Sequence, residues 1–211
     1  MLTISNYIKQ GENQTQDFKF AIDDQKKIAR TLVAFANTDG GRLLIGVKDS
    51  GKVVGCNPEE EFHMIEGAAQ MYCKPLIEFK SQVHKEGFRM VLEVIVESNS
   101  KRPFLALDEE GKWKSYFRKD ANTLLVNKIL FKVWQYEARK TARPEKFSEE
   151  ELSLLNLFEN DAALTLSQLY RKSDLSMKSV DHWLALFVSW GLVEMKFEGE
   201  KAVYSSMELK V

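Results

Sequence analysis

Hydrophobic and polar residues alternate over residues 16–21. This period of two predicts a half-buried strand with Phe18 and Phe20 on its buried face. After the aspartates at positions 23 and 24, apolar residues recur every three or four positions up to Asn37. That spacing predicts an amphipathic helix whose first turn is capped by an aspartate.

The remaining apolar segments as far as residue 137 predict an alternation of strands and helices. Two glycines, Gly40 and Gly41, follow the first helix, because glycine adopts the backbone conformations that a tight turn needs. The predicted strands are residues 43–47, 52–54, 77–85, 88–97 and 113–118, and the predicted helices are residues 59–72 and 123–137. Helices interleaved with a mostly paired sheet make an α+β fold, a mixed α/β layer domain.

A second, smaller domain is predicted near the end of the chain. Residues 139–146 have no apolar period, and Pro144 discourages continuation of a helix. We therefore expect a domain at 1–140, a linker at 141–147 and a domain at 148–211. The elements predicted after the linker are helices opened by capping boxes at Ser148 and Thr165, a helix from Ser176 to Trp190, and hairpin strands at 192–196 and 201–205. This order is typical of a winged-helix-like domain.

Charge is balanced over the chain, which has 30 basic and 31 acidic residues, but it is uneven locally. Residues 112–146 hold ten lysines and arginines against three acidic residues, whereas residues 147–211 hold six against eleven. A local basic excess attracts a polyanion, because neutralisation of phosphates drives non-specific nucleic-acid binding. The acidic second domain fits protein contact or dimerisation about as well as it fits the reading of bases.

The sequence shows no pattern of a secreted, membrane-spanning or zinc-binding protein. Residues 2–9 lack the basic and apolar regions of a signal peptide, and no window approaches a membrane span. Cys56 and Cys73 are far apart, which is typical of free thiols in a reducing compartment. The three histidines are scattered and have no zinc-binding spacing. We expect a cytoplasmic protein.

Five segments together form a recognisable pattern: Gly11-Glu12, Asp17-Phe18-Lys19, the stretch AFANTDGGRLLIGVKDSGKVVG at 34–55, Lys101-Arg102-Pro103-Phe104, and Ser115-Tyr116-Phe117-Arg118-Lys119-Asp120. In these segments the chain resembles the Schlafen-type AlbA-like domain over roughly residues 5–140. The resemblance implies a domain that binds DNA or RNA. With the predicted second domain, we expect a DNA-binding regulator of transcription and a homodimer, which would bring the basic stretches of two first domains onto one duplex.

The same resemblance implies a possible metal site. Carboxylates that match Glu12, Asp17 and Asp49 are assigned in Schlafen relatives to metal-dependent cleavage of RNA, which would make these residues ligands of Mg²⁺ or Mn²⁺. Asp17 stands where the family usually has glutamate. The alternative interpretation is that Glu12 caps a turn, Asp17 faces solvent from a strand, and Asp49 is an ordinary turn aspartate.

The expected nucleic-acid contacts are basic residues. Four of them occupy positions of the family pattern: Lys19, Arg42, Lys48 and Arg118. Lys119 directly follows Arg118, and Lys178 lies in the predicted third helix of the second domain. Tyr116 and Phe117 offer a stacking surface for bases, although such aromatics more often belong to a core.

The resemblance also carries an ATP-binding label, which the residues do not favour. Gly41 and Gly46 have the separation of a P-loop, but Val47 stands where the lysine is required. The leading hypothesis is a nucleic-acid-binding protein that acts as a DNA-binding regulator of transcription. The alternatives are a metal-dependent endoribonuclease, a protein-interaction adaptor and an ATP-binding protein.

Overall fold

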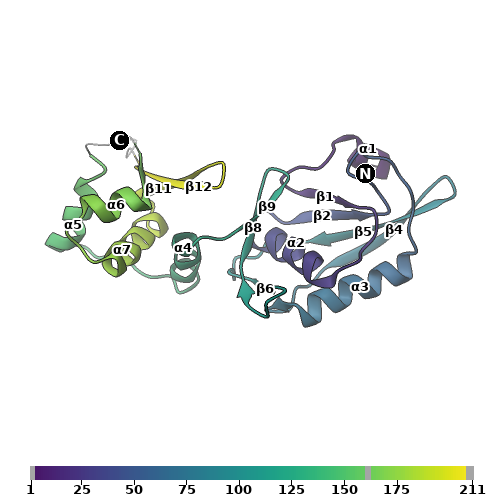
Figure 1. Ribbon diagram of the computed structural model, residues 1–211, viewed down its shortest axis with the longest axis horizontal. Coiled ribbons are helices and arrows are strands. Elements are labelled where there is room, and N and C mark those ends of the chain that lie inside the picture. Colours follow the sequence, from purple (N-terminus) through teal and green to yellow (C-terminus); the bar gives the residue numbers. More distant parts are fainter. Residues whose placement is uncertain (1–2, 160–162, 208–211) are drawn as a thin grey trace. The chain divides into compact units, whose positions relative to one another are not determined.

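The computed structural model describes residues 3–159 and 163–207, and it divides into two compact units. Unit 1 extends to Val126 and unit 2 begins at Asn127 (Figure 1). Each unit is described by itself. Within the described residues, no helix is both long enough and apolar enough to cross a membrane.

Unit 1 is built on a four-stranded sheet with strand order β1-β2-β5-β4. β1 and β2 are parallel, and the other two pairings are antiparallel. Helices α2 and α3 cover one face of this sheet, and the short helix α1 packs on the other. The bounds are α1 Ile4–Lys9, β1 Gln16–Lys19, α2 Gln25–Asn37, β2 Gly41–Ile45, α3 Pro58–Met71, β4 Lys80–Glu86 and β5 Arg89–Val96.

Alternation along β2 explains why the sheet is buried on both sides. Leu43 and Ile45 belong to the core under α2 and α3, whereas Leu44 packs with Phe18 and Ile4 beneath α1. Successive side chains of a strand point to opposite faces, so one apolar strand can serve two cores. The predicted central strand is confirmed.

The first predicted helix is also confirmed. Asp24 caps α2, because its carboxylate accepts the backbone N–H groups of Lys26 and Lys27. The helix ends at Asn37, whose buried side-chain amide donates to the carbonyl oxygens of Phe104 and Tyr116 at 3.0 and 2.8 Å. The end of α2 is thereby fastened to the last strands of unit 1.

Two small sheets complete unit 1. One is an antiparallel sheet of order β3-β6-β7, and the other is the hairpin of β8 and β9. Their bounds are β3 Cys73–Lys74, β6 Leu105–Leu107, β7 Trp113–Lys114, β8 Tyr116–Lys119 and β9 Asn122–Leu125. The single strand expected at 113–118 is thus two strands in different sheets. The strand expected at 52–54 is reduced to one bridge between Val47 and Val53.

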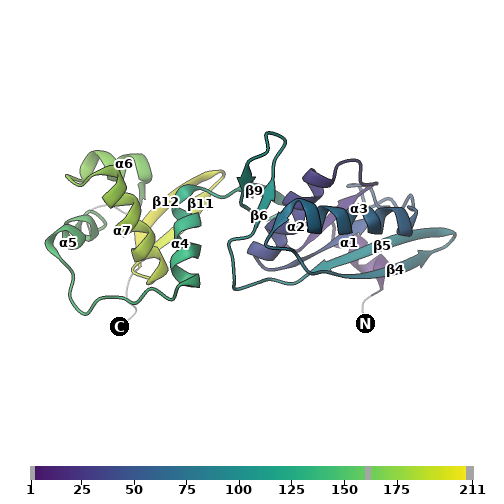
Figure 2. The ribbon, with the colours of Figure 1, turned by 90° about the horizontal axis from the view of Figure 1, so that it is seen from below.

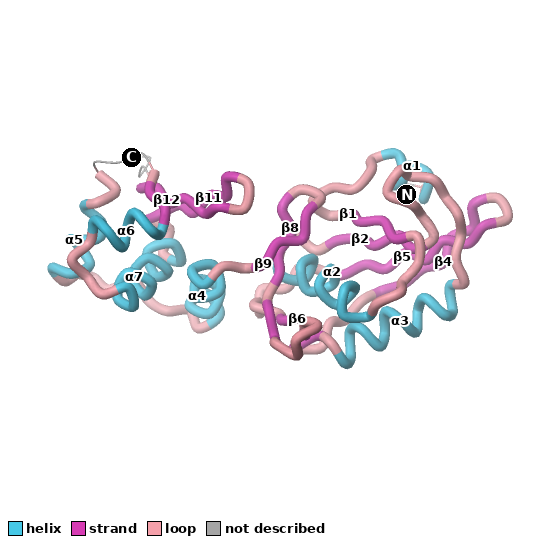
Figure 3. The backbone as a smooth tube through the Cα atoms, viewed as in Figure 1, coloured by secondary structure: helices cyan, strands magenta, loops and turns pink. Residues whose placement is uncertain are grey.

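The described part of unit 2 contains four helices and an antiparallel sheet of order β10-β12-β11 (Figure 3). Both predicted capping boxes are present, Ser148 with Glu151 and Thr165 with Gln168. The bounds are α4 Lys128–Ala138, α5 Glu149–Asn156, β10 Leu164–Thr165, α6 Leu166–Lys172, α7 Met177–Ser189, β11 Val193–Glu198 and β12 Lys201–Ser206. The predicted third helix and hairpin are confirmed, while the winged-helix assignment stays a prediction.

Helix α4 belongs to unit 2, whereas the sequence placed it in the first domain. The predicted helix at 123–137 begins only at Lys128, because residues up to Leu125 pair as β9 and Asn127 caps the helix. α4 then packs against α7. The boundary therefore lies after Val126 and not near residue 140.

Candidate nucleic-acid interface

Arg118, predicted to contact nucleic acid, is buried inside unit 1 with 2% of its side chain exposed. Its guanidinium donates to the backbone oxygens of Asn13 and Gln16 at 2.9 and 3.3 Å. It also contacts the carboxylate of Asp17 at 3.4 Å and the hydroxyl of Thr123 at 3.2 Å. A phosphate cannot reach a guanidinium enclosed in this way, so the expected role of Arg118 is corrected to a structural one.

Two of the three predicted carboxylates come together. Glu12 accepts the backbone N–H of Phe18 at 3.0 Å and lies beside Asp17. Burial raises the pKa of Glu12, and the nearby charge of Asp17 acts in the same direction, against the hydrogen bond from Phe18. Asp17 itself is buried, and its two oxygens face Lys19 at 2.8 Å and Arg118 at 3.4 Å. Asp17 is therefore already neutralised by cations, and it does not face solvent as the alternative interpretation assumed.

Asp49, the third predicted carboxylate, is exposed in the turn between Lys48 and Lys52. Among residues 3–159 and 163–207, no group of three histidine, cysteine, aspartate or glutamate side chains could hold a metal ion. The donor set in this arrangement does not fit Mg²⁺ or Mn²⁺, which prefer several oxygen ligands around one point.

Arg42 also has its charge satisfied within unit 1. Its Nε atom contacts a carboxylate oxygen of Glu93, and its guanidinium lies 3.5 Å from the centre of the Tyr7 ring. The other oxygen of Glu93 accepts a contact from His84 Nε2 at 2.6 Å. Since Glu93 is 3% exposed, this network fixes α1 over the sheet and leaves Arg42 poorly placed for a phosphate.

Phe20 follows Lys19 at the carboxyl end of β1, and Lys48 lies just beyond the carboxyl end of the parallel strand β2. The backbone oxygen of Lys19 accepts the N–H of Gly46 at 2.9 Å, which brings the two chain segments together. Phe20 is 58% exposed, and the Nζ atom of Lys48 lies 5.7 Å from the centre of its ring. Lys48 forms no ion pair within the described part of the chain. We call these three residues the lysine–phenylalanine corner.

The sequence pattern missed Phe20. Alternation over residues 16–21 predicted that Phe20 shares the buried face of Phe18, but β1 ends at Lys19 and the alternation ends with it. Pairing stops there because the partner β2 ends at Ile45, opposite Lys19. No local signal in residues 16–21 marks that end.

The remaining predicted contacts are Lys119 and Lys178. Lys119 is half-buried at the end of β8, and Lys178 is exposed in the first turn of α7. The next turn of α7 is covered by α4: Tyr136 contacts His182 Nδ1 at 2.7 Å, and Lys128 forms an ion pair with Asp181 at 3.0 Å. In a DNA-reading winged helix, α7 would lie in the groove, but part of α7 is covered by α4 of the same unit.

The family model for the Schlafen AlbA_2 domain matches residues 12–127, more than half of the chain. This protein belongs to the Schlafen AlbA_2 family. The match begins at Glu12 and ends at Asn127, the cap of α4, so it covers the sheet of unit 1 and the corner. Membership suggests a nucleic-acid-binding role.

Two solved structures are similar to the Schlafen AlbA_2 chain. One is the N-terminal domain of a RecG-related protein from Nitrosomonas europaea, at 24% identity, with a TM-score of 0.38 over 46% of this chain and 74% of that one. The other is the DIP2311 protein from Corynebacterium diphtheriae, at 15% identity, with a TM-score of 0.45 over 82% of this chain and 32% of that one. The chain thus spans about a third of the length of the DIP2311 protein. No curated protein matches.

Proposed function

We propose that unit 1 binds single-stranded nucleic acid, DNA or RNA, at the lysine–phenylalanine corner. The observation that carries the proposal is the exposed ring of Phe20 beside the unpaired ammonium of Lys48. Bases stack on exposed aromatic rings, and neighbouring cations neutralise the phosphates that link them. The exposed phenylalanine and the ammonium of Lys48 supply both contacts at one place, whereas the ammonium of Lys19 is held by Asp17.

The proposal is tested by fluorescence anisotropy with short single-stranded DNA and RNA at two salt concentrations. We expect Phe20→Ala to weaken binding by about 5- to 100-fold, because one stacked base is lost. Lys48→Ala is expected to weaken binding to all sequences alike and to lower the salt dependence by about one phosphate contact.

A second lysine–aromatic pair in unit 1 supplies a matched control. Lys74 Nζ lies 6.0 Å from the centre of the Trp113 ring, and Trp113 is 42% exposed. Trp113→Ala should leave binding unchanged. Loss of binding in Trp113→Ala to the same extent as in Phe20→Ala would show that the corner is not the site.

Regulation of transcription is the biological role that we propose for this binding. Unit 2 has the order of a winged-helix-like domain, and α4 covers part of α7, so we assign unit 2 to protein contact and not to base reading. Lys178→Ala is therefore not expected to change nucleic-acid binding.

Metal-dependent cleavage of RNA is the second candidate function. It is favoured only by the proximity of Glu12 and Asp17, and among the residues that the structure describes no third carboxylate joins them. Incubation of labelled RNA with Mn²⁺ tests it directly. Cleavage that disappears in Glu12→Gln would establish the nuclease, whereas absence of any binding to nucleic acid at low salt would favour an adaptor.

A further inference from the structure

Strand β4 is a free edge of the unit 1 sheet. It stands last in the order β1-β2-β5-β4, so only its β5 side is paired (Figure 2). Within the described ranges, no backbone hydrogen bond joins its other side to another segment. Five of its seven residues are exposed, and Val83 in its middle is 45% exposed. Such an edge is a template for a further strand unless something protects it.

The sequence of β4 is complementary to a second, antiparallel copy of itself. When Val83 lies opposite the partner's Val83 on a twofold axis, Lys80 lies opposite the partner's Glu86, and the reverse pair forms symmetrically. Directly opposite residues of antiparallel strands point to the same face, so each lysine meets a glutamate. In the neighbouring register, which has Gln82 on the twofold axis, Glu86 would instead lie opposite the partner's Glu78.

Lys80 and Glu86 can both form these pairs with the partner without losing strong contacts of their own. Lys80 now pairs with Glu97, but both side chains of that pair are more than 70% exposed, so little is lost when Lys80 turns to the half-buried Glu86 of the partner. Glu86 accepts a hydrogen bond from Ser5 at 2.8 Å, and a carboxylate has further acceptor positions for a lysine. The charged ends of β4 are therefore available on both copies.

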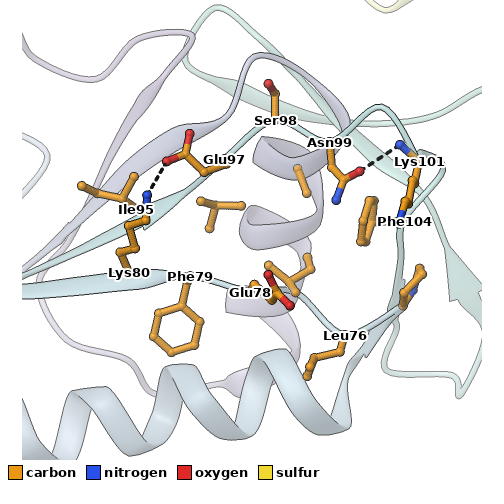
Figure 4. A pocket seen from close by; sticks show the side chains of 14 residues that line it. Leu76, Glu78, Phe79, Lys80, Ile95, Glu97, Ser98, Asn99, Lys101 and Phe104 are labelled. Atoms are coloured by element: carbon orange, nitrogen blue, oxygen red, sulfur yellow. Dashed lines mark hydrogen bonds and ion pairs between the residues drawn. The ribbon is translucent and has the colours of Figure 1, made fainter.

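The same register gives the tip of the β4–β5 hairpin a binding place. Phe88 in this turn is fully exposed, at 103%, and antiparallel pairing brings the turn that ends β4 toward the segment that precedes the partner's β4. The segment around Glu78 borders a cavity of about 460 Å³, which also has Leu76 and Phe79 among its lining residues (Figure 4). Leu76 is 56% exposed, so both apolar surfaces lack cover in one copy and would cover each other in two.

We propose that the protein forms a homodimer by antiparallel pairing of β4 with β4, with Val83 on the twofold axis and Phe88 of each copy against the other copy's cavity. This surface is separate from the lysine–phenylalanine corner. It extends the four-stranded sheet of each copy into one sheet of eight strands across the interface.

Engineered cysteines test the register. In a Cys56→Ser background, Val83→Cys should form a disulfide-linked dimer under mild oxidation, because opposite Cβ atoms lie about 5 Å apart. Ser81→Cys and Lys85→Cys are matched controls on the same face of the strand. In this register, each of these two residues lies about 13 Å from the same residue of the partner, so neither variant should cross-link. Equal cross-linking of all three, or none in Val83→Cys, would overturn the proposal.

Charge exchange tests the same interface without covalent chemistry. Lys80→Glu should weaken dimerisation about tenfold or more in sedimentation equilibrium, because two attractive pairs become repulsive. The double change Lys80→Glu with Glu86→Lys should restore it, since the exchanged charges are again opposite. Lys85→Glu, of equal charge change but opposite a serine, is the control and should have little effect.

Phe88→Ala should also weaken the dimer, whereas Met71→Ala, which removes a 65% exposed side chain from α3, should not. A wild-type chain that stays monomeric at high micromolar concentration would refute the proposal. So would a double charge exchange that leaves the dimer as weak as Lys80→Glu alone while circular dichroism shows the fold intact.

Discussion

One arginine ties together three segments of unit 1. Arg118, on β8, donates to backbone oxygens that precede and begin β1, and to a side chain on β9. Its charge faces the buried carboxylate of Asp17. A buried cation with this many partners is expensive to remove, because its acceptors lose their donors without gaining water.

We predict that Arg118→Met lowers the free energy of unfolding of unit 1 by about 3–5 kcal/mol. Urea unfolding followed by far-ultraviolet circular dichroism measures the loss. Lys48→Met is the matched control, since Lys48 is exposed, and it should change stability by about 0.5 kcal/mol or less while weakening nucleic-acid binding. The structural role of Arg118 is contradicted if Arg118→Met keeps its stability and loses only binding.

Glu12 is expected to give the stability of unit 1 a dependence on pH. Burial raises the pKa of Glu12 above its ordinary value of 4.5, so the folded chain holds the proton to a higher pH than the unfolded chain does. The contribution of Glu12 to the free energy of unfolding is complete below pH 4.5, and it is lost as the pH rises through the raised pKa. Stability should therefore fall with rising pH across this window.

Glu12→Gln should flatten that part of the profile, because an amide keeps an acceptor for the N–H of Phe18 and has no proton to lose. The measurement is the free energy of unfolding at pH steps from 4 to 7. A profile of Glu12→Gln that keeps the wild-type slope above pH 4.5 would assign the dependence to another group.

At the scale of elements, the sequence predicted what local signals determine. α2 and α3 have caps and a regular apolar period, and the β4–β5 hairpin has a turn at Gly87 with alternation on both sides. The capping boxes at Ser148 and Thr165 were recognised because both partners lie within one helical turn. These elements form where their own residues favour them.

Other elements depend on pairing that the sequence does not display. The apolar period of α4 continues back to Leu124 and Val126 and predicts a helix from residue 123, but residues 122–125 pair with β8 instead. The end of β1 at Lys19 likewise depends on the length of β2. The corner at Phe20 follows from that end, so the candidate site escaped prediction for the same reason as the strand boundary.

The candidate carboxylates show a related limit. The family pattern named Glu12, Asp17 and Asp49, and the fold brings only the first two together. Asp17 is neutralised by Lys19 and by Arg118, and Arg118 lies about a hundred residues later in the chain. Long-range partners of this kind decide whether a carboxylate is a ligand or part of the core, and spacing does not report them.

At the scale of the whole molecule, the position of the boundary decides which pieces of the chain are stable alone. α4 buries Ile129, Val133 and Trp134 within unit 2 and ties Lys128 to Asp181 of α7. A cut at residue 140, as the sequence pattern suggested, would separate α4 from the helix on which it packs. A cut after Val126 keeps each core complete.

We therefore predict that a fragment of residues 127–211 folds cooperatively, and that a fragment of residues 141–211 melts at least about 10 °C lower, because it lacks α4 and leaves the side of α7 on which α4 packs exposed to water. Thermal unfolding by circular dichroism compares the two. The reciprocal pair is the control: residues 1–126 should be as stable as residues 1–140, since α4 adds nothing to the core of unit 1. A fragment 1–126 that melts well below 1–140 would return α4 to the first domain, and with it the basic residues between 128 and 140 to the nucleic-acid-binding part of the chain.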